Sequence, residues 1–263
     1  MTAIFRLTMA SALALGLAVP PALAADLSVA VTRDADTFDP ANHRNRETET
    51  ILRNLYDGLV TRDADMKVVP EIAESITQVS PTEYDFTIRK GVKFHDGSDL
   101  TVEDVKFTLD RIALDGGMGD GVTSPRQGLI GPVEKVDILN ADTVRITLSE
   151  PWPILLAMLP NQQMVSKAHV EAVGNNGLAT QPMGTGPFRL AEWRKGDSVI
   201  MERFDDYYGG ATDIPPVGPA CVDRVIFKVI PESASRIAAL LAGDVDIITE
   251  LPPFSVAQVD NNP

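Results

Sequence analysis

Cysteine and histidine are scarce in this chain of 263 residues, and their scarcity excludes several kinds of site. Cys221 is the single cysteine, so the chain can form no intramolecular disulfide and has no C-x-x-C pair for a zinc or redox site. The three histidines, His43, His95 and His169, lie far apart in sequence, and none belongs to an H-E-x-x-H motif. Because candidate ligands are so few, we predict neither a bound metal nor a cofactor.

The motifs of common enzyme classes are also missing. The chain has no G-x-S-x-G turn, which α/β-hydrolases use to expose a nucleophilic serine. The glycine-rich run GGMGDG (116–121) matches neither the dinucleotide fingerprint nor the phosphate loop with its lysine. The paired acids Asp205–Asp206 and Asp244/Asp246 would suit a glycosidase, yet adjacent acids are common on protein surfaces. We therefore predict that the chain is not an enzyme and keep a secreted hydrolase as the alternative.

Positive charge is in short supply too, with 23 lysines and arginines against 37 acidic residues and a formal net charge of −14. Such an acidic surface argues against nucleic acid and anionic membranes as partners. The hydrophobic share of 44% permits a core that needs no disulfide to support it.

The first 24 residues have the pattern of a secretory signal peptide. Arg6 is an early cation, an apolar run follows from Leu7 to Val19, and Ala22-Leu23-Ala24 supplies small residues at a cleavage site. This run is shorter than the about 20 residues that a permanent membrane-spanning helix needs. We expect cleavage after Ala24 and a periplasmic mature chain that starts at Ala25.

Hydrophobic periodicity predicts strands and helices in irregular alternation. Alternating or continuous apolar residues predict strands, and apolar residues at helical spacing predict helices. The expected strands are 27–31, 83–91, 133–139, 143–148, 187–193, 198–204 and 222–230, and the expected helices are 47–56, 102–112, 151–160 and 232–241. Two segments rich in glycine or proline, 115–128 and 212–220, are expected to be loops.

One run, GVKFHDGSDLTVEDVKFTLDR (91–111), combines a histidine with several acids and could be interpreted as a metal cluster or an acid/base pair. Local structure explains it without chemistry. Asp96-Gly97 is typical of a turn, and Thr101 followed by Asp104 fits a capping box at the start of a helix. We expect a strand, a turn and a capped helix here.

Three segments together resemble a known family. They are 68–111 with KFHDG, 183–210 with GTGPF, and 222–247 with VDRVIFKVIPESASRIAALLAGDVDI. In this order they resemble the periplasmic dipeptide/oligopeptide/nickel solute-binding proteins of ABC importers, solute-binding family 5. The resemblance covers nearly the whole mature chain.

This resemblance implies an α/β fold: a lobe like those of type II periplasmic binding proteins, with a mixed sheet flanked by helices and an inserted α+β subdomain. Family members are roughly twice this long, so we expect the second lobe to be missing. The expected division is a signal peptide at 1–24, a first lobe from 25–45 with 178–263, and a subdomain at 46–177.

The resemblance also implies where a ligand binds. Phe38-Asp39-Pro40 matches a family motif, and counting on toward LYDGL (55–59) puts the contact stretch at Arg44, Asn45 and Arg46. Two arginines there would pair with a ligand carboxylate, or they are simply exposed cations before a helix. In GTGPF (184–188), Thr185 and Gly186 are further candidates, although the motif also suits a structural turn.

The implied function is the substrate-binding component of an ABC importer, which captures peptides or similar small solutes and delivers them to a membrane permease. We expect it to act as a monomer. The alternative is a truncated, non-binding remnant or regulatory module. The ligand stays open among dipeptides, oligopeptides, glutathione-like molecules, sugars and metal chelates.

Overall fold

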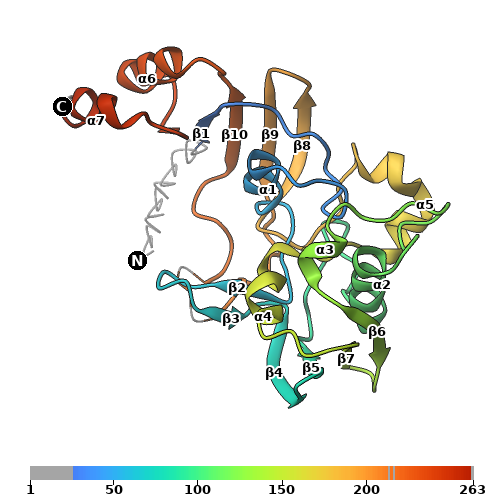
Figure 1. Cartoon of the computed structure of the whole chain (residues 1–263). Helices are drawn as coiled ribbons and strands as arrows, with labels where there is room; N and C mark the ends of the chain where they lie inside the picture. The colour runs from blue at the N-terminus through green and yellow to red at the C-terminus, as the bar shows by residue number, and fades with distance from the viewer. Residues whose placement is uncertain (1–25, 213, 216, 262–263) are drawn as a thin grey trace, which may run out of the picture.

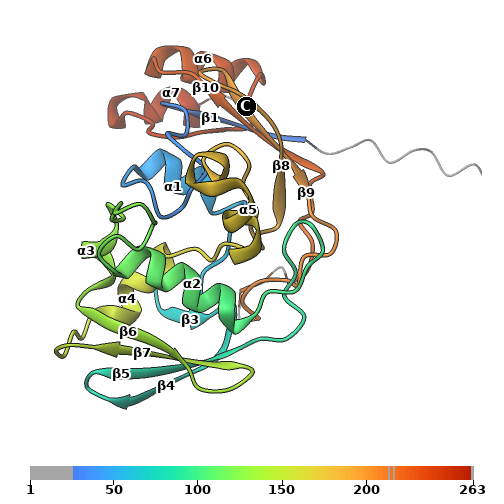
Figure 2. The same cartoon turned by 90° about the vertical axis from the view of Figure 1, so that its right-hand side faces the viewer.

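The structure is a computed structural model that describes residues 26–212, 214–215 and 217–261. The predicted signal peptide lies outside the described residues. The described residues form two larger sheets and one two-stranded sheet, with helices between the larger sheets and a further helical layer on the outer face of the first (Figure 2). The mixed α/β class with helix-flanked sheets is the predicted one.

The first sheet has five strands in the order β11-β1-β10-β9-β8. Their bounds are β1 Asp26–Val31, β8 Phe188–Arg194, β9 Ser198–Arg203, β10 Arg224–Val229 and β11 Ile247–Ile248. β1 pairs in parallel with β10 and β11, whereas β9 is antiparallel to both β8 and β10, so the sheet is mixed. The helices α6 (Ser233–Ala242) and α7 (Val256–Asp260) lie on one side, and α1 (Arg46–Leu52) and α5 (Lys167–Leu178) on the other (Figure 2).

The second sheet is antiparallel, in the order β4-β5-β7-β6. Its strands are β4 Ala73–Ser80, β5 Glu83–Ile88, β6 Val133–Ile138 and β7 Thr143–Leu148. Helix α2 (Val102–Ala113) covers one face (Figure 2). The strand pair β2 (Val60–Arg62) and β3 (Val68–Pro70), the helices α3 (Gln127–Ile130) and α4 (Leu155–Met158), and the short 3-10 helices η1 (Leu159–Asn161) and η2 (Pro253–Ser255) complete the described elements.

In the 91–111 run the turn and the capped helix form as predicted, whereas the expected strand is reduced to an isolated bridge between Lys93 and Asp99. The capping box is present, because the backbone N–H of Thr101 donates to Asp104 Oδ2 at 2.9 Å. The other carboxylate oxygen of Asp104 accepts from the N–H of Lys167 at 2.9 Å, which ties the start of α2 to α5. Asp99 forms an ion pair with Lys93 at 2.6 Å. Asp99 and Asp104 therefore have structural partners.

Two hydrophobic clusters divide the interior. One, between α2 and the second sheet, draws nearly all its buried members from 59–164; the other contains the apolar side of the first sheet. Ile51 and Leu52 of α1 and Val170 and Leu178 of α5 belong to the cluster of the first sheet. We therefore propose narrower subdomain limits, about 59–164, than the expected 46–177; the division into domains stays a prediction.

A buried ion pair links the two clusters. Arg111 of α2 donates to Asp39 in two parallel hydrogen bonds, Nη1 to Oδ1 at 2.9 Å and Nη2 to Oδ2 at 2.6 Å. The two side chains are 2% and 0% exposed. Arg111 Nη2 also donates to Asn175 Oδ1 of α5 at 2.6 Å. This bidentate geometry is strongly directional, so the pair fixes α2 against the loop that follows β1.

Candidate functional site

A hollow of about 200 Å³ opens where β1 and β11 end. Because these strands are parallel, their carboxyl ends meet at one edge of the sheet, which is the usual place for ligands in open α/β sheets. The hollow is lined by Val31, Arg46, Glu47, Thr50, Thr249 and Glu250. β1 and α1 lie close together in Figure 1, and the loop that joins them carries the residues predicted to bind ligand.

Of the predicted stretch 44–46, Arg46 lines this hollow, and Arg44 and Asn45 directly precede it in the chain. Asn45 is the N-cap of α1, and its Oδ1 accepts from the N–H groups of Glu47 at 2.9 Å and Thr48 at 3.3 Å. Arg44 and Arg46 are exposed, and neither guanidinium forms an ion pair within the described part of the chain. Asn45 therefore has a structural role, and two cations beside it remain available to an anion.

Behind this stretch lies a buried polar network that the sequence did not predict. Arg126 is 3% exposed; its Nη1 donates to Glu49 Oε2 at 3.0 Å and to His43 Nε2 at 2.9 Å. Glu49 Oε1 also accepts from Arg53 Nε at 3.1 Å and from Gln163 Nε2 at 2.5 Å. Glu49 thus joins α1 to segments more than 70 residues away.

The electrostatics of this network favour a neutral His43. Burial lowers the pKa of His43, and the neighbouring Arg126 guanidinium lowers it further. A neutral imidazole is also required if Nε2 accepts the hydrogen bond from Arg126. The network therefore supports the 43–46 segment through hydrogen bonds, and His43 adds no positive charge to it at neutral pH.

Thr185 and Gly186 lie elsewhere, inside the protein. Thr185 is fully buried, and the N–H of Gly186 donates to the carbonyl of Leu55 at 3.0 Å. A Cβ on Gly186 would lie 2.5 Å from the carbonyl carbon of Leu55, so glycine is needed for this close backbone contact. This placement supports the structural-turn alternative. The assignment of the two residues as ligand contacts stays a prediction.

The three histidines have separate partners. His43 contacts Arg126, His95 Nε2 is 3.1 Å from the carbonyl of Gly186, and His169 Nε2 is 2.7 Å from the carbonyl of Gln181. Among the described residues there is no group of three or more histidines, cysteines or acids that would hold a metal. No helix in the described ranges is long and apolar enough to cross a membrane.

Comparison with known proteins decides the family. The model of the bacterial extracellular solute-binding proteins, family 5, matches residues 67–263. The chain belongs to this family. The match confirms the predicted family, and it includes the three segments on which the prediction was based.

Relatives agree with this membership. The glutathione-binding protein GsiB of Salmonella choleraesuis is 30% identical over 254 residues, which are 95% of this chain and 47% of the relative. Among solved structures, DppA from Helicobacter pylori with the peptide STSA has a TM-score of 0.80 at 26% identity, covering 90% of this chain and 49% of that one. AgaA from A. tumefaciens R10 with agropinic acid has a TM-score of 0.79 at 29% identity, covering 90% and 46%. The chain thus spans about half the length of the relatives it matches.

Proposed function

We propose that this chain forms one wall of the solute-binding cleft in the substrate-binding component of an ABC importer, and that its ligands are peptides or similar small solutes. The observation that carries the proposal is the exposed guanidinium of Arg46 at the hollow by the carboxyl edge of the sheet, with exposed Arg44 two residues before it; neither forms an ion pair within the described residues. Family membership supports it, as do the peptide and glutathione named for the relatives.

In this proposal the arginines bind a ligand carboxylate with charge-assisted hydrogen bonds. The cap of Asn45 and the network around Glu49 fix the backbone that carries the two arginines, so the loop loses little conformational entropy when ligand binds. A second lobe then closes over the ligand by a hinge motion, and the closed form is recognised by a membrane permease. The working form is a periplasmic monomer that does no chemistry on its ligand and has no nucleic-acid partner.

Isothermal calorimetry with the tetrapeptide Ser-Thr-Ser-Ala and with glutathione tests the proposal. Replacing both arginines, Arg44→Ala with Arg46→Ala, should weaken binding by about 10–100-fold, because a hydrogen bond to a charged group contributes about 1.5–3 kcal/mol. Arg194→Ala is the matched control: it removes an exposed arginine from the opposite edge of the same sheet and should leave affinity unchanged. Unchanged affinity in the double variant would remove the proposed role of the arginines.

A second candidate is a non-binding remnant or regulatory module that occupies the permease without solute. The two candidates differ in one measurement. If the purified chain gives no heat with either probe, while circular dichroism shows it folded, the second candidate is favoured over the first.

A further inference from the structure

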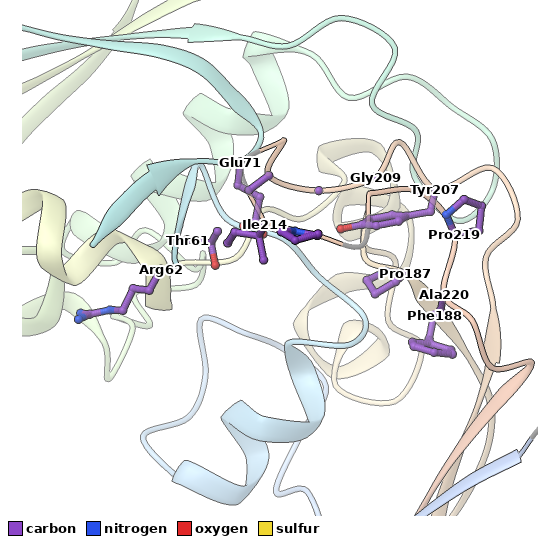
Figure 3. A pocket seen from close by; sticks show the side chains of 14 residues that line it. Thr61, Arg62, Glu71, Pro187, Phe188, Tyr207, Gly209, Ile214, Pro219 and Ala220 are labelled. Carbon is purple, nitrogen blue, oxygen red and sulfur yellow. The ribbon is translucent and has the colours of Figure 1, made fainter. Parts of the chain in front are cut away.

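A second hollow of about 380 Å³ lies beside the β2–β3 pair, and none of its lining residues belongs to the hollow at Arg46 (Figure 3). Much of its wall is apolar, including Pro187, Phe188, Ile214 and Ala220. Arg62 points away from the centre in Figure 3 and donates to the carbonyl of Ala157 instead. The polar groups that remain at the hollow include Glu71 and the Tyr207 hydroxyl, which points inward.

Behind Glu71 and Tyr207 lies a second carboxylate, Asp57. Asp57 is 5% exposed, and its Oδ1 accepts from the Tyr207 hydroxyl at 3.5 Å. The hydroxyls of Thr185 and Tyr208 also act on this carboxylate, although neither is within hydrogen-bond distance of Oδ2. Glu71 Oε2 accepts from the backbone N–H of Gly58 at 2.9 Å. Buried charges are nearly always paired, so two neighbouring acids without an ion pair among the described residues are unusual.

No cation pairs with either acid within the described residues. Neither Asp57 nor Glu71 forms an ion pair, and Arg89 and Arg53 act on Glu71 only through space. The Arg89 guanidinium lies over the Tyr208 ring, 5.8 Å from its centroid. Burial raises the pKa of Asp57 well above its usual range and that of Glu71 to about 7. The two acids therefore lack the positive charge that would let both ionise at low cost.

We propose that this hollow is a binding site for a small organic amine, whose ammonium group pairs with Glu71 while its apolar chain lies against Pro187 and Phe188. An ammonium donates three hydrogen bonds, which suits an acid at the hollow that has no ion-pair partner among the described residues. A metal ion fits less well, because the described residues hold no group of three acidic, histidine or cysteine ligands. This site is separate from the proposed solute cleft and goes beyond that function.

The test uses n-butylamine on the purified chain, with butan-1-ol as the uncharged analogue, and ligand-detected NMR titration as the readout. We expect saturable binding of the amine and at least tenfold weaker binding of the alcohol. The amine stays protonated between pH 6 and pH 8, whereas Glu71 loses its charge as the pH falls. The affinity of the chain for the amine should therefore be about tenfold weaker at pH 6 than at pH 8.

Two variants locate the effect. Glu71→Gln keeps an acceptor for the Gly58 N–H but removes the charge, and it should weaken amine binding at least tenfold and abolish the pH dependence. Glu74→Gln, an exposed acid three residues further on, should change neither. Equal binding of amine and alcohol by the wild-type chain, or unchanged amine affinity in Glu71→Gln, would overturn the proposal. The first comparison needs no variant, so a misfolded variant would not leave the question open.

Discussion

Two buried aspartates in this protein have opposite surroundings. Asp39 is fully buried and meets Arg111 in a bidentate ion pair, and its Oδ1 also accepts from the N–H of Ala41 at 3.0 Å. Asp57 is almost as buried, yet it forms no ion pair among the described residues, and the charge that acts on it is that of another acid, Glu71. The same side chain thus meets a cation at one site, whereas at the other burial and a neighbouring acid raise its pKa.

The difference follows from where the sites lie. Asp39 is at the junction of the two hydrophobic clusters, where a directional ion pair fixes how α2 meets the loop that follows β1. Asp57 contacts Tyr207, which lines a hollow, and no cation pairs with Asp57 in the described part of the chain. Satisfied buried networks rigidify a fold, whereas unsatisfied ones mark places where a ligand, water or proton completes the structure.

The largest expected effect is at the paired site. Asp39→Ala leaves the Arg111 guanidinium buried without a counter-charge and should lower the free energy of unfolding by about 3–5 kcal/mol. Urea unfolding followed by circular dichroism measures the change. Asp36→Ala is the control, because it removes a carboxylate that pairs with Arg33 on the surface, where both side chains are about half exposed. The control should cost less than about 1 kcal/mol. Equal losses in the two variants would contradict the view that the buried pair holds the junction.

The unpaired site should respond to pH with the opposite sign from a paired carboxylate. The pKa of Glu71 is raised from 4.5 to about 7, so between these values the folded chain holds more protons than the unfolded chain. This group therefore lowers the free energy of unfolding as the pH rises from 4.5 to 7, by at most about 1.4 kcal/mol per pH unit. Glu71→Gln should reduce that slope and should be more stable than the wild type at pH 8.

Urea unfolding at pH 5, 6, 7 and 8 measures this dependence. The curve for Glu74→Gln should run parallel to that of the wild type, because that acid is exposed. Asp57 lies next to Glu71 and its pKa is raised too, so some slope of the same sign should persist in Glu71→Gln. If the curves of the wild type and Glu71→Gln run parallel, Glu71 does not titrate in this range and the contrast with Asp39 weakens.

Much of the fold was predictable because it follows local patterns. The alternation in Glu83–Ile88 and Thr143–Leu148 is matched by alternate burial along both strands, and the helix expected at 232–241 is present as α6. The missed elements lack such patterns. β4 is an edge strand with mostly exposed residues, so its sequence does not alternate, and α5 is interrupted at Gly174.

The candidate site was predictable only where it is local in sequence. The 44–46 stretch follows a family motif and precedes a helix, and both features are visible in the printed sequence. Arg126 was missed because its segment, 115–128, has the composition of a loop and its partner Glu49 is 77 residues away. The Asp57–Glu71 group was missed because its partner is also distant in sequence: Tyr207, which contacts Asp57, lies 150 residues further along the chain. Such contacts depend on tertiary structure, which no short pattern encodes.

The smallest expected effect comes from removing the hydroxyl of Tyr207, the neutral partner of Asp57; Asn175, the neutral partner of the Asp39–Arg111 pair, gives the comparison. Tyr207→Phe removes a hydrogen bond to Asp57 that is 3.5 Å long, at the outer limit for such bonds, and should cost less than about 0.5 kcal/mol. Asn175→Ala removes the amide oxygen that accepts from Arg111 at 2.6 Å and should cost about 1.5–3 kcal/mol, because that bond involves a buried charge. Urea unfolding of both variants at pH 7 gives the comparison. A larger loss in Tyr207→Phe than in Asn175→Ala would mean that Asp57 is held as firmly as Asp39, and would leave the hollow beside it without an acid that needs a partner.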